Sequence, residues 1–230
     1  MIEKNIFQSW FTRDLHPIVQ ANIDRIKRLN PTYTHAIYTD NEMDDFVNTN
    51  FKGEIAYSYN KLNIIVAKVD FWRYLILYKY GGVYLDMDSS IERPLDDLIK
   101  ETDQAIVTAE GNPEKYVQWA LIFQKGHPIL KKTIELIVEN IKYNKYPNDI
   151  LQMTGPVVYS TAININHKEL YGCTVQHNTI NYYTNISYDN YRIYGIDFND
   201  FFSLTYPGYE LLYINKPHWR QEQQIKPLLK

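Results

Sequence analysis

Apolar residues recur along this chain at two spacings, one typical of amphipathic helices and the other of short buried strands. The helical spacing is clearest across residues 61–80, where apolar side chains return every three or four positions until Gly81 and Gly82 interrupt them. A buried strand is expected directly after these glycines. The whole pattern predicts strands at 5–10, 34–38 and 105–108 and helices at 17–29, 41–48, 61–80 and 127–143. This alternation predicts an α/β fold with a mainly parallel sheet flanked by helices.

The C-terminal third has a different composition, with tyrosine and asparagine crowded between residues 171 and 213. Short extended pieces at 180–183 and 191–196 predict a small antiparallel ribbon. A tyrosine can stack its ring on a sugar face and hydrogen-bond through its hydroxyl. We expect most of these tyrosines to cover the ribbon and a few to line an acceptor groove.

Size and charge narrow the choice of function. A chain of 230 residues suits one domain, spanning residues 1–230. The formal net charge of -3, with lysine and arginine scattered, argues against nucleic acid as a partner. The single cysteine, Cys173, excludes an intramolecular disulfide. No obligate protein partner is evident.

The same composition leads to an expectation about location. No apolar stretch reaches the length of a membrane span, and the first residues lack the apolar core of a signal peptide. We therefore expect a soluble, cytoplasmic protein. The abundance of asparagine, isoleucine, lysine and tyrosine suggests an AT-rich genome and favours a bacterial or viral source.

Two carboxylates, Asp86 and Asp88, follow the glycine pair at the end of the expected strand. On a strand, alternate residues project from the same face, about 6.5 to 7 Å apart along the backbone. Two anions at this distance repel each other, whereas a divalent cation would neutralise both. The pair therefore indicates a metal site with something anionic for the metal to hold.

Asp70 and Arg73 stand three residues apart on the helix before the glycines and so share one side of it. The spacing allows two interpretations. One is a site that binds a ligand, and the other is an ordinary surface ion pair, worth about 0.2 to 0.5 kcal/mol to the helix.

Residues 67–88, which read AKVDFWRYLILYKYGGVYLDMD, resemble the core motif of glycosyltransferase family 32. These DXD sugar transferases include initiating α-1,6-mannosyltransferases and α-1,4-galactosyltransferases. Residues 4–10 are similar to the first strand of that family, and weaker similarity continues to the C-terminal residues His218 and Trp219. The resemblance implies a GT-A fold, in which a nucleotide-sugar binds beyond the carboxyl ends of the strands.

The resemblance also implies roles for particular residues. Asp86 and Asp88 would coordinate Mn2+ or Mg2+, which would hold the diphosphate of the donor. Asp70 and Arg73 match positions that contact the donor sugar. The other donor-binding positions that it implies are Gln8, Trp10, His218 and Trp219, with His218 also a candidate metal ligand.

Two of these positions have a second interpretation. Trp10 could be a core aromatic residue at a strand end, rather than a residue that packs near the nucleotide base. His218 could be a solvent-facing residue on a C-terminal tail, because it adjoins Trp219 directly, whereas the family usually separates its histidine and tryptophan.

Together these features predict a metal-dependent retaining glycosyltransferase that moves a hexosyl unit from a nucleoside diphosphate sugar to a glycan or other hydroxyl acceptor. A UDP-sugar is the favoured donor and GDP-mannose the next. The alternative is a catalytically silent relative that binds carbohydrate or nucleotide-sugar. A glycoside hydrolase is disfavoured, because two carboxylates on one strand face cannot flank a glycosidic bond.

Overall fold

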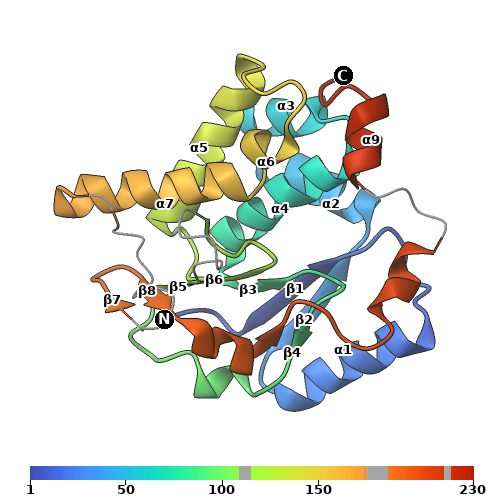
Figure 1. Ribbon diagram of the computed structural model, residues 1–230, viewed down its shortest axis with the longest axis vertical. Coiled ribbons are helices and arrows are strands. Elements are labelled where there is room, and N and C mark those ends of the chain that lie inside the picture. Colours follow the sequence, from blue (N-terminus) through green and yellow to red (C-terminus); the bar gives the residue numbers. More distant parts are fainter. Residues whose placement is uncertain (109–114, 174, 176–185, 215–218) are drawn as a thin grey trace.

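The computed structural model describes residues 1–108, 115–173, 175, 186–214 and 219–230 of the chain (Figure 1). Its strands are β1 (Asn5–Ser9), β2 (Thr34–Tyr38), β3 (Gly82–Leu85), β4 (Ser90–Ile91), β5 (Ala105–Thr108), β6 (Ala120–Phe123), β7 (Ile186–Ser187), β8 (Arg192–Tyr194) and β9 (Phe202–Ser203). Its α-helices are α1 (Pro17–Leu29), α2 (Asp40–Asn50), α3 (Glu54–Lys61), α4 (Ile65–Tyr80), α5 (Pro128–Lys142), α6 (Ile150–Met153), α7 (Pro156–Tyr171) and α9 (Trp219–Ile225). Three short 3-10 helices are η1 (Leu95–Asp97), η2 (Ile196–Asp200) and η3 (Tyr209–Tyr213).

Several helices begin where the local sequence can satisfy their free N–H groups. At α1, the His16 side chain accepts a hydrogen bond from the backbone of Ile18, and Pro17 occupies the first helical turn. At α2, Thr39 and Glu42 form a reciprocal capping box. Both helices, predicted at 17–29 and 41–48 from apolar spacing, are observed at nearly those bounds, and the caps fix where they begin.

The central sheet of the described residues has the strand order β2-β1-β3-β6-β5-β8-β7. Strands β2, β1, β3, β5 and β8 run in one direction, while β6 and β7 run against them. The sheet is therefore mostly parallel, as the alternating sequence pattern predicted. A separate two-stranded sheet joins β4 to β9.

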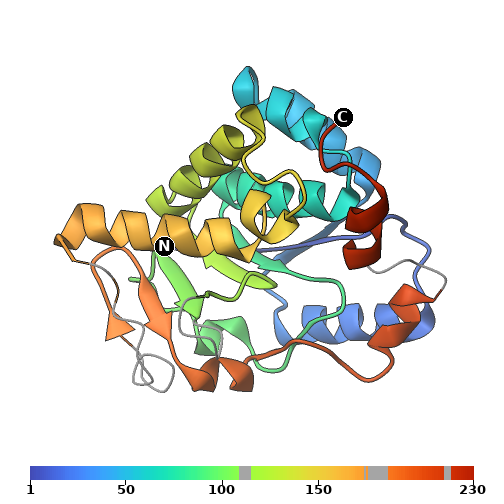
Figure 2. The same ribbon diagram turned by 45° about the horizontal axis from the view of Figure 1, so that its top comes forward.

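Helices cover both faces of the sheet (Figures 1 and 2). Helices α2 to α7 lie over one face, while α1 and the C-terminal 3-10 helices lie over the other. Successive strand residues point into different cores because side chains alternate along a strand. Phe7 and Tyr84 belong to the first core, and Ile6 and Val83 belong to the second.

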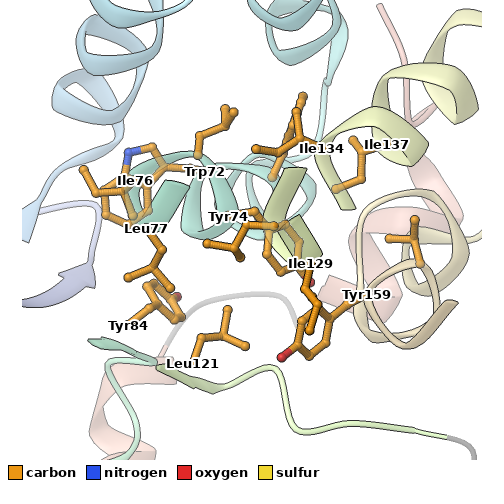
Figure 3. Packing of buried hydrophobic residues seen from close by; sticks show 14 of the residues in the cluster. Trp72, Tyr74, Ile76, Leu77, Tyr84, Leu121, Ile129, Ile134, Ile137 and Tyr159 are labelled. Atoms are coloured by element: carbon orange, nitrogen blue, oxygen red, sulfur yellow. The ribbon is translucent and has the colours of Figure 1, made fainter. Parts of the chain in front are cut away.

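Helix α4 lies at the centre of the larger core and is buried almost all round (Figure 3). Trp72 and Leu77 of α4 pack in the same core cluster as Tyr84 of β3 and Ile134 of α5. A helix in such a place must have any charged side chain paired, because an unpaired buried charge is strongly unfavourable. Asp70 and Arg73 belong to this helix and are both buried.

The predicted helix over residues 61–80 is wrong at its beginning, because residues 62–64 are not helical and separate α3 from α4. At the break, Leu62 forms an isolated antiparallel bridge with Leu229, and the backbone of Asn63 donates to the carbonyl of Leu228 at 2.8 Å. The end of the chain therefore occupies this gap. A contact across so many residues leaves no trace in local periodicity.

The C-terminal ribbon is attached to the main sheet. Strands β7 and β8 are antiparallel to each other, as expected, but β8 also pairs in parallel with β5. Tyr191, which precedes β8, is buried, and its ring stacks on that of Tyr188 at 4.9 Å. The predicted piece at 180–183 lies outside the described residues. Strand β6 and helices α3, α6 and α7 were not predicted.

Within the described part of the chain, no helix combines the length and the apolar composition needed to cross a bilayer.

The close approach of β1 and β3 generates a first prediction. Gly82 has a φ of +115°, and a Cβ added there would lie 2.6 Å from the carbonyl oxygen of Asn5. We expect Gly82→Ala to lower the free energy of unfolding by more than the roughly 1–3 kcal/mol of backbone strain alone, because the neighbouring strand must also move. Urea denaturation measures the change.

Gly126→Ala is the matched control, since Gly126 has a φ of +73° but no atom within 4 Å of the added Cβ. Equal losses in the two variants would show that the close approach of the strands contributes nothing.

Candidate active site

A sharp glycine turn sets the position of the candidate site by reversing the chain between α4 and β3. Gly81 ends α4 with a φ of +66°, and its N–H donates to the carbonyl of Leu77 at 2.8 Å. Gly82 then begins the buried strand β3. As a result, Asp70 and Arg73 on α4 lie beside Asp86, which follows β3.

Arg73 joins the two segments electrostatically. Its Nη2 lies 3.1 Å from Asp70 Oδ1 and 3.3 Å from Asp86 Oδ1, while its Nη1 donates to the carbonyl of Gln118 at 3.1 Å. The side chains of Arg73 and Asp70 are only 6% and 7% exposed. The interpretation of Asp70 and Arg73 as a surface ion pair is therefore wrong.

Asp70 is held by two further side chains that the sequence did not identify as site residues. Gln118 donates to Asp70 Oδ1 at 3.3 Å, and Thr154 donates to Asp70 Oδ2 at 3.3 Å. Thr154 begins the short segment 154–156, which also has weak similarity to the family, but no local signal marks Gln118. Burial raises the pKa of Asp70 to about 6 from its ordinary 3.8, while the charge of Arg73 opposes the rise.

The two carboxylates after β3 do not share a strand face, so that prediction is wrong. Strand β3 ends at Leu85, and the next residues form a turn in which the N–H of Ser89 donates to the carbonyl of Asp86 at 3.1 Å. The pairing of β3 with β1 has already ended at Tyr84, and on the β6 side one backbone hydrogen bond, from the N–H of Asp86 to the carbonyl of Trp119, extends past Leu85. The carboxylate groups of Asp86 and Asp88 are oriented by side-chain contacts.

Those contacts differ for the two residues. Asp86 Oδ1 accepts from the hydroxyl of Tyr84 at 2.6 Å, and the Asp86 side chain is 28% exposed. Asp88 Oδ2 accepts from the hydroxyl of Tyr213 at 2.7 Å. Burial raises the pKa of Asp86 to about 6; Arg73 lowers it and the charge of Asp88 raises it.

This arrangement fits a divalent cation that is held partly by the protein and partly by a bound substrate. Among the described residues, no cluster of three histidine, cysteine, aspartate or glutamate side chains could enclose a metal. Mg2+ and similar ions, however, are often held by one or two carboxylates together with water and substrate phosphates. A cation beside Asp86 and Asp88 would also relieve the repulsion from Asp88, which adds to burial in raising the pKa of Asp86.

Trp10 lies just past the end of β1, half-buried at the edge of the site. Its ring centroid is 5.3 Å from that of Phe11 and 6.2 Å from that of Tyr213, at 85° to the latter. Tyr213 therefore contacts both Trp10 and Asp88. The sequence did not identify Tyr213 as a site residue, and the roles of Trp10, Asp86 and Asp88 in donor binding remain predictions.

Gln8 is fully buried and lies within the sheet. Its Nε2 donates to the carbonyl of Asp86 at 3.2 Å, and its Oε1 lies 2.8 Å from His35 Nε2. The polar atoms of Gln8 are thus engaged by the protein, although Gln8 remains a predicted donor-binding position.

The C-terminal candidates are only partly described. His218 lies outside the described residues, so its predicted metal contact stays a prediction. Trp219 begins α9, and its side chain lies outside the described part. Helix α9 itself is placed by Gln223 Oε1, which accepts from the N–H of Ile150 at 2.9 Å.

One groove lies apart from the carboxylates. It measures about 680 Å³ and opens beside β2 and α2, with Arg13, His35, Tyr38 and Glu42 among its lining residues. The chemistry-bearing residues face a different region of the sheet, where the carboxyl ends of β1 and β3 meet. That position is where ligands of open α/β sheets bind.

Comparisons with known proteins find sugar transferases among the relatives of this chain. A family model described as a glycosyltransferase sugar-binding region containing a DXD motif matches residues 17–105. The initiation-specific alpha-1,6-mannosyltransferase of Schizosaccharomyces pombe is 27% identical over 168 residues, covering 60% of this chain and 42% of that protein. Inositol phosphoceramide mannosyltransferase 3 of the same yeast is 29% identical over 160 residues, covering 69% and 44%. The chain thus spans less than half the length of these two relatives.

Solved structures support the fold. The PaToxG glycosyltransferase superposes with a TM-score of 0.57 at 21% identity, covering 74% of this chain and 72% of that one. The ligand-free glycosyltransferase domain of the YGT toxin superposes with a TM-score of 0.52 at 10% identity, covering 74% and 79%. These matches confirm the predicted GT-A-like fold.

The comparisons also correct the expected source and location. A soluble cytoplasmic protein was expected because no membrane span or signal peptide was found, and a bacterial or viral origin was expected from composition, but the two mannosyltransferases named above are yeast proteins. That expectation is wrong, because amino-acid composition reflects genome bias and does not specify a compartment.

The turn at residues 86–88 (the DXD turn) and the buried aspartate and arginine beside it lie on a GT-A-like fold. Together with the match of residues 17–105, they lead to one conclusion: the chain carries the DXD-containing sugar-binding region of glycosyltransferases and is similar to yeast mannosyltransferases, as the sequence resemblance predicted.

Proposed function

We propose that residues 1–230 form one catalytic domain that transfers a hexosyl unit, with retention at the anomeric carbon, from a nucleoside diphosphate sugar to a glycan or other hydroxyl acceptor. The names of the yeast relatives favour a mannosyl donor over the UDP-sugar that the sequence placed first. The observation that carries the proposal is Arg73, which contacts both Asp70 and Asp86 beside the DXD turn.

Asp86 and Asp88 are the residues that would hold Mn2+ or Mg2+. Their carboxylate oxygens are the hard ligands that such ions prefer. A bound divalent cation supplies Lewis acidity, which stabilises the negative charge that develops on the leaving diphosphate. Tyr84 and Tyr213 hold the two carboxylates through their hydroxyls.

Asp70 and Arg73 would hold hydroxyls of the donor sugar. The Nε of Arg73 is buried and has no hydrogen-bond partner among the described residues. A buried unsatisfied N–H costs about 1–3 kcal/mol, which an oxygen atom of a bound ligand would offset. Thr154 and Gln118 keep the Asp70 carboxylate oriented while it accepts from the sugar.

The alternative remains a silent relative that binds the donor without transferring its sugar. Turnover of a nucleotide-sugar separates the two, since a binder alone produces no free nucleoside diphosphate. The shared strand face of Asp86 and Asp88 no longer argues against a glycoside hydrolase, but the structure offers no support for one. Arg73 Nη2 lies within 3.1 Å of Asp70 and 3.3 Å of Asp86, so a guanidinium lies between the two carboxylates.

The proposed metal role predicts the effect of Asp88→Asn. This change removes a charged ligand but keeps an oxygen that can accept from Tyr213, so the melting temperature should stay within about 2 °C of wild type. Transfer should fall at least about 100-fold, because losing a group that only orients a metal ligand already costs roughly 10–100-fold. Metal-dependent release of nucleoside diphosphate and Mn2+ binding by electron paramagnetic resonance measure the change. Asp97→Asn, in an exposed ion pair with Arg93, is the control. Near-normal turnover in EDTA would falsify the metal role.

The proposed sugar contact predicts that Asp70→Asn impairs transfer while nucleoside diphosphate binding survives. Asparagine keeps the shape of the side chain but lacks the negative charge that accepts strongly from sugar hydroxyls. We expect kcat to fall by about 10²-fold or more, with the affinity for UDP and GDP unchanged in calorimetric titration. A parallel loss of nucleotide affinity would return Asp70 to a purely structural role.

The raised pKa of Asp70 predicts an unusual dependence of stability on pH. Its pKa is 3.8 in the unfolded chain and about 6 in the fold. Between these values the folded state binds more protons, so the contribution of Asp70 to the free energy of unfolding is present below pH 4 and is lost as pH rises through 6. As pH rises across this window, the free energy of unfolding of wild type should therefore fall by about 3 kcal/mol relative to that of Asp70→Asn.

Denaturant titrations of both proteins at several pH values between about 3.5 and 7.5 measure this difference. Transfer should show the opposite trend and fall below about pH 6, because the sugar contact requires the ionised carboxylate. A stability difference that does not vary with pH would contradict the raised pKa.

A further inference from the structure

The main chain of Asp86 is held from both sides, although it lies beyond the end of its strand. The pairing between β1 and β3 ends at Phe7 and Tyr84. On one side, the N–H of Asp86 donates to the carbonyl of Trp119 at 2.8 Å. On the other side, the carbonyl of Asp86 accepts from the side chain of Gln8 at 3.2 Å. The Gln8 side chain thus supplies a hydrogen bond to Asp86 where the backbone pairing of β1 with β3 has ended.

Gln8 can do this only if its amide points the right way. The side chain is fully buried, and its Nε2 donates to the Asp86 carbonyl. Its Oε1 must therefore accept, and His35 Nε2 lies 2.8 Å from it. Since an amide oxygen cannot donate, the hydrogen of this bond belongs to His35 Nε2.

The surroundings of His35 keep its ring neutral. Burial, together with the positive charge of Lys27 on α1, lowers the pKa of His35 to about 4. From α2, Glu42 lines the same groove but is paired with Arg13 at 2.6 Å; Asp45 of α2 also lines it. Above about pH 5 a neutral imidazole with its hydrogen on Nε2 therefore faces Gln8.

We propose that His35 and Gln8 form a positioning pair for the DXD turn, in which the imidazole orients the Gln8 amide and the amide holds the carbonyl of Asp86. The inference rests on the proposed function, because it gives the pair a role in setting the carboxylates that would bind metal and donor. His35 contacts neither substrate nor metal and acts only through Gln8.

Loss of the imidazole would leave Gln8 Oε1 without its donor. The amide could then rotate and turn its oxygen toward the carbonyl of Asp86, where two acceptors repel each other. The turn would loosen by a fraction of an ångström, which is enough to weaken a metal site. Groups that orient metal ligands typically change metal affinity by roughly 10–100-fold when removed.

Three variants at one position test the pair. His35→Gln places an amide N–H near the position of Nε2–H, whereas His35→Asn is too short to reach Gln8 and His35→Leu has no donor. We expect Mn2+ affinity, measured by electron paramagnetic resonance without nucleotide, to fall about 10-fold in His35→Leu and His35→Asn, and to stay within about threefold of wild type in His35→Gln. The value of kcat should follow the same order.

Thr34→Val is the matched control, because it changes an exposed residue of the same edge strand and leaves the pair intact. Melting temperatures separate a structural role from a positioning role. If His35→Leu melts lower but its folded form binds Mn2+ as wild type does, the inference is overturned. Equal Mn2+ affinity in all three His35 variants would overturn it as well.

Nitrogen-15 NMR of the imidazole provides a test that does not depend on activity. We expect the His35 ring to carry its proton on Nε2 and not to titrate between about pH 5 and pH 8. A ring protonated on Nδ1, or one that titrates near the ordinary histidine pKa of about 6.5, would overturn the inference. If wild type neither binds Mn2+ nor turns over a donor, the proposed function fails, while the NMR result still decides whether the pair exists.

Discussion

The buried guanidinium of Arg73 is the interaction on which the rest of this site depends. Helix α4 is surrounded by other elements, so its two charged residues near the site cannot reach bulk water. Arg73 satisfies Asp70 within the helix and Asp86 after the next strand, and its guanidinium lies 4.6 Å from the centre of the Tyr84 ring. Removing one member of such a buried group leaves a charge uncompensated, which typically costs about 3–5 kcal/mol. The positions of Arg73, Asp70 and Asp86 therefore depend on one another.

The glycine turn makes this arrangement possible at short range. Because Gly81 and Gly82 adopt backbone angles that other residues rarely adopt, α4 reverses directly into β3 and Arg73 comes within reach of Asp86. The neighbouring strand β6 is antiparallel to β3. The residues just before β6 therefore reach the site, where the carbonyl of Trp119 accepts from the N–H of Asp86 and the side chain of Gln118 donates to Asp70.

The C-terminal segment holds the other side of the DXD turn. Tyr206 donates to the carbonyl of Met87 at 3.3 Å, Ser89 donates to the carbonyl of Leu204 at 2.9 Å, and Tyr213 binds Asp88. The pairing of β4 with β9 keeps these segments together. A turn held in this way from the sheet and from the C-terminal segment suits a site whose ligands must be positioned before substrate binds.

Local sequence determined the elements whose signals lie within a few residues of each other. The helix caps at His16 and Thr39, the glycine pair and the spacing of Asp70 from Arg73 and of Asp86 from Asp88 all belong to this class. Apolar spacing and the glycine pair predicted the α/β order and the bounds of α1 and β2, and residues 67–88 carried the resemblance to the sugar transferases. The same spacing predicted a shared strand face for Asp86 and Asp88, which is wrong because periodicity cannot show where a strand ends.

Tertiary structure decided which residues meet these carboxylates. Gln118 reaches Asp70 across 48 residues of sequence, Thr154 reaches it across 84, and Tyr213 reaches Asp88 across 125. Gln8 and His35 are brought together by strand pairing and not by any shared motif. Such contacts depend on how strands and helices stack and on the requirement that each buried polar group find a partner. A local pattern records the propensity of a segment, and the partner that satisfies a buried charge is selected only when distant segments pack against it.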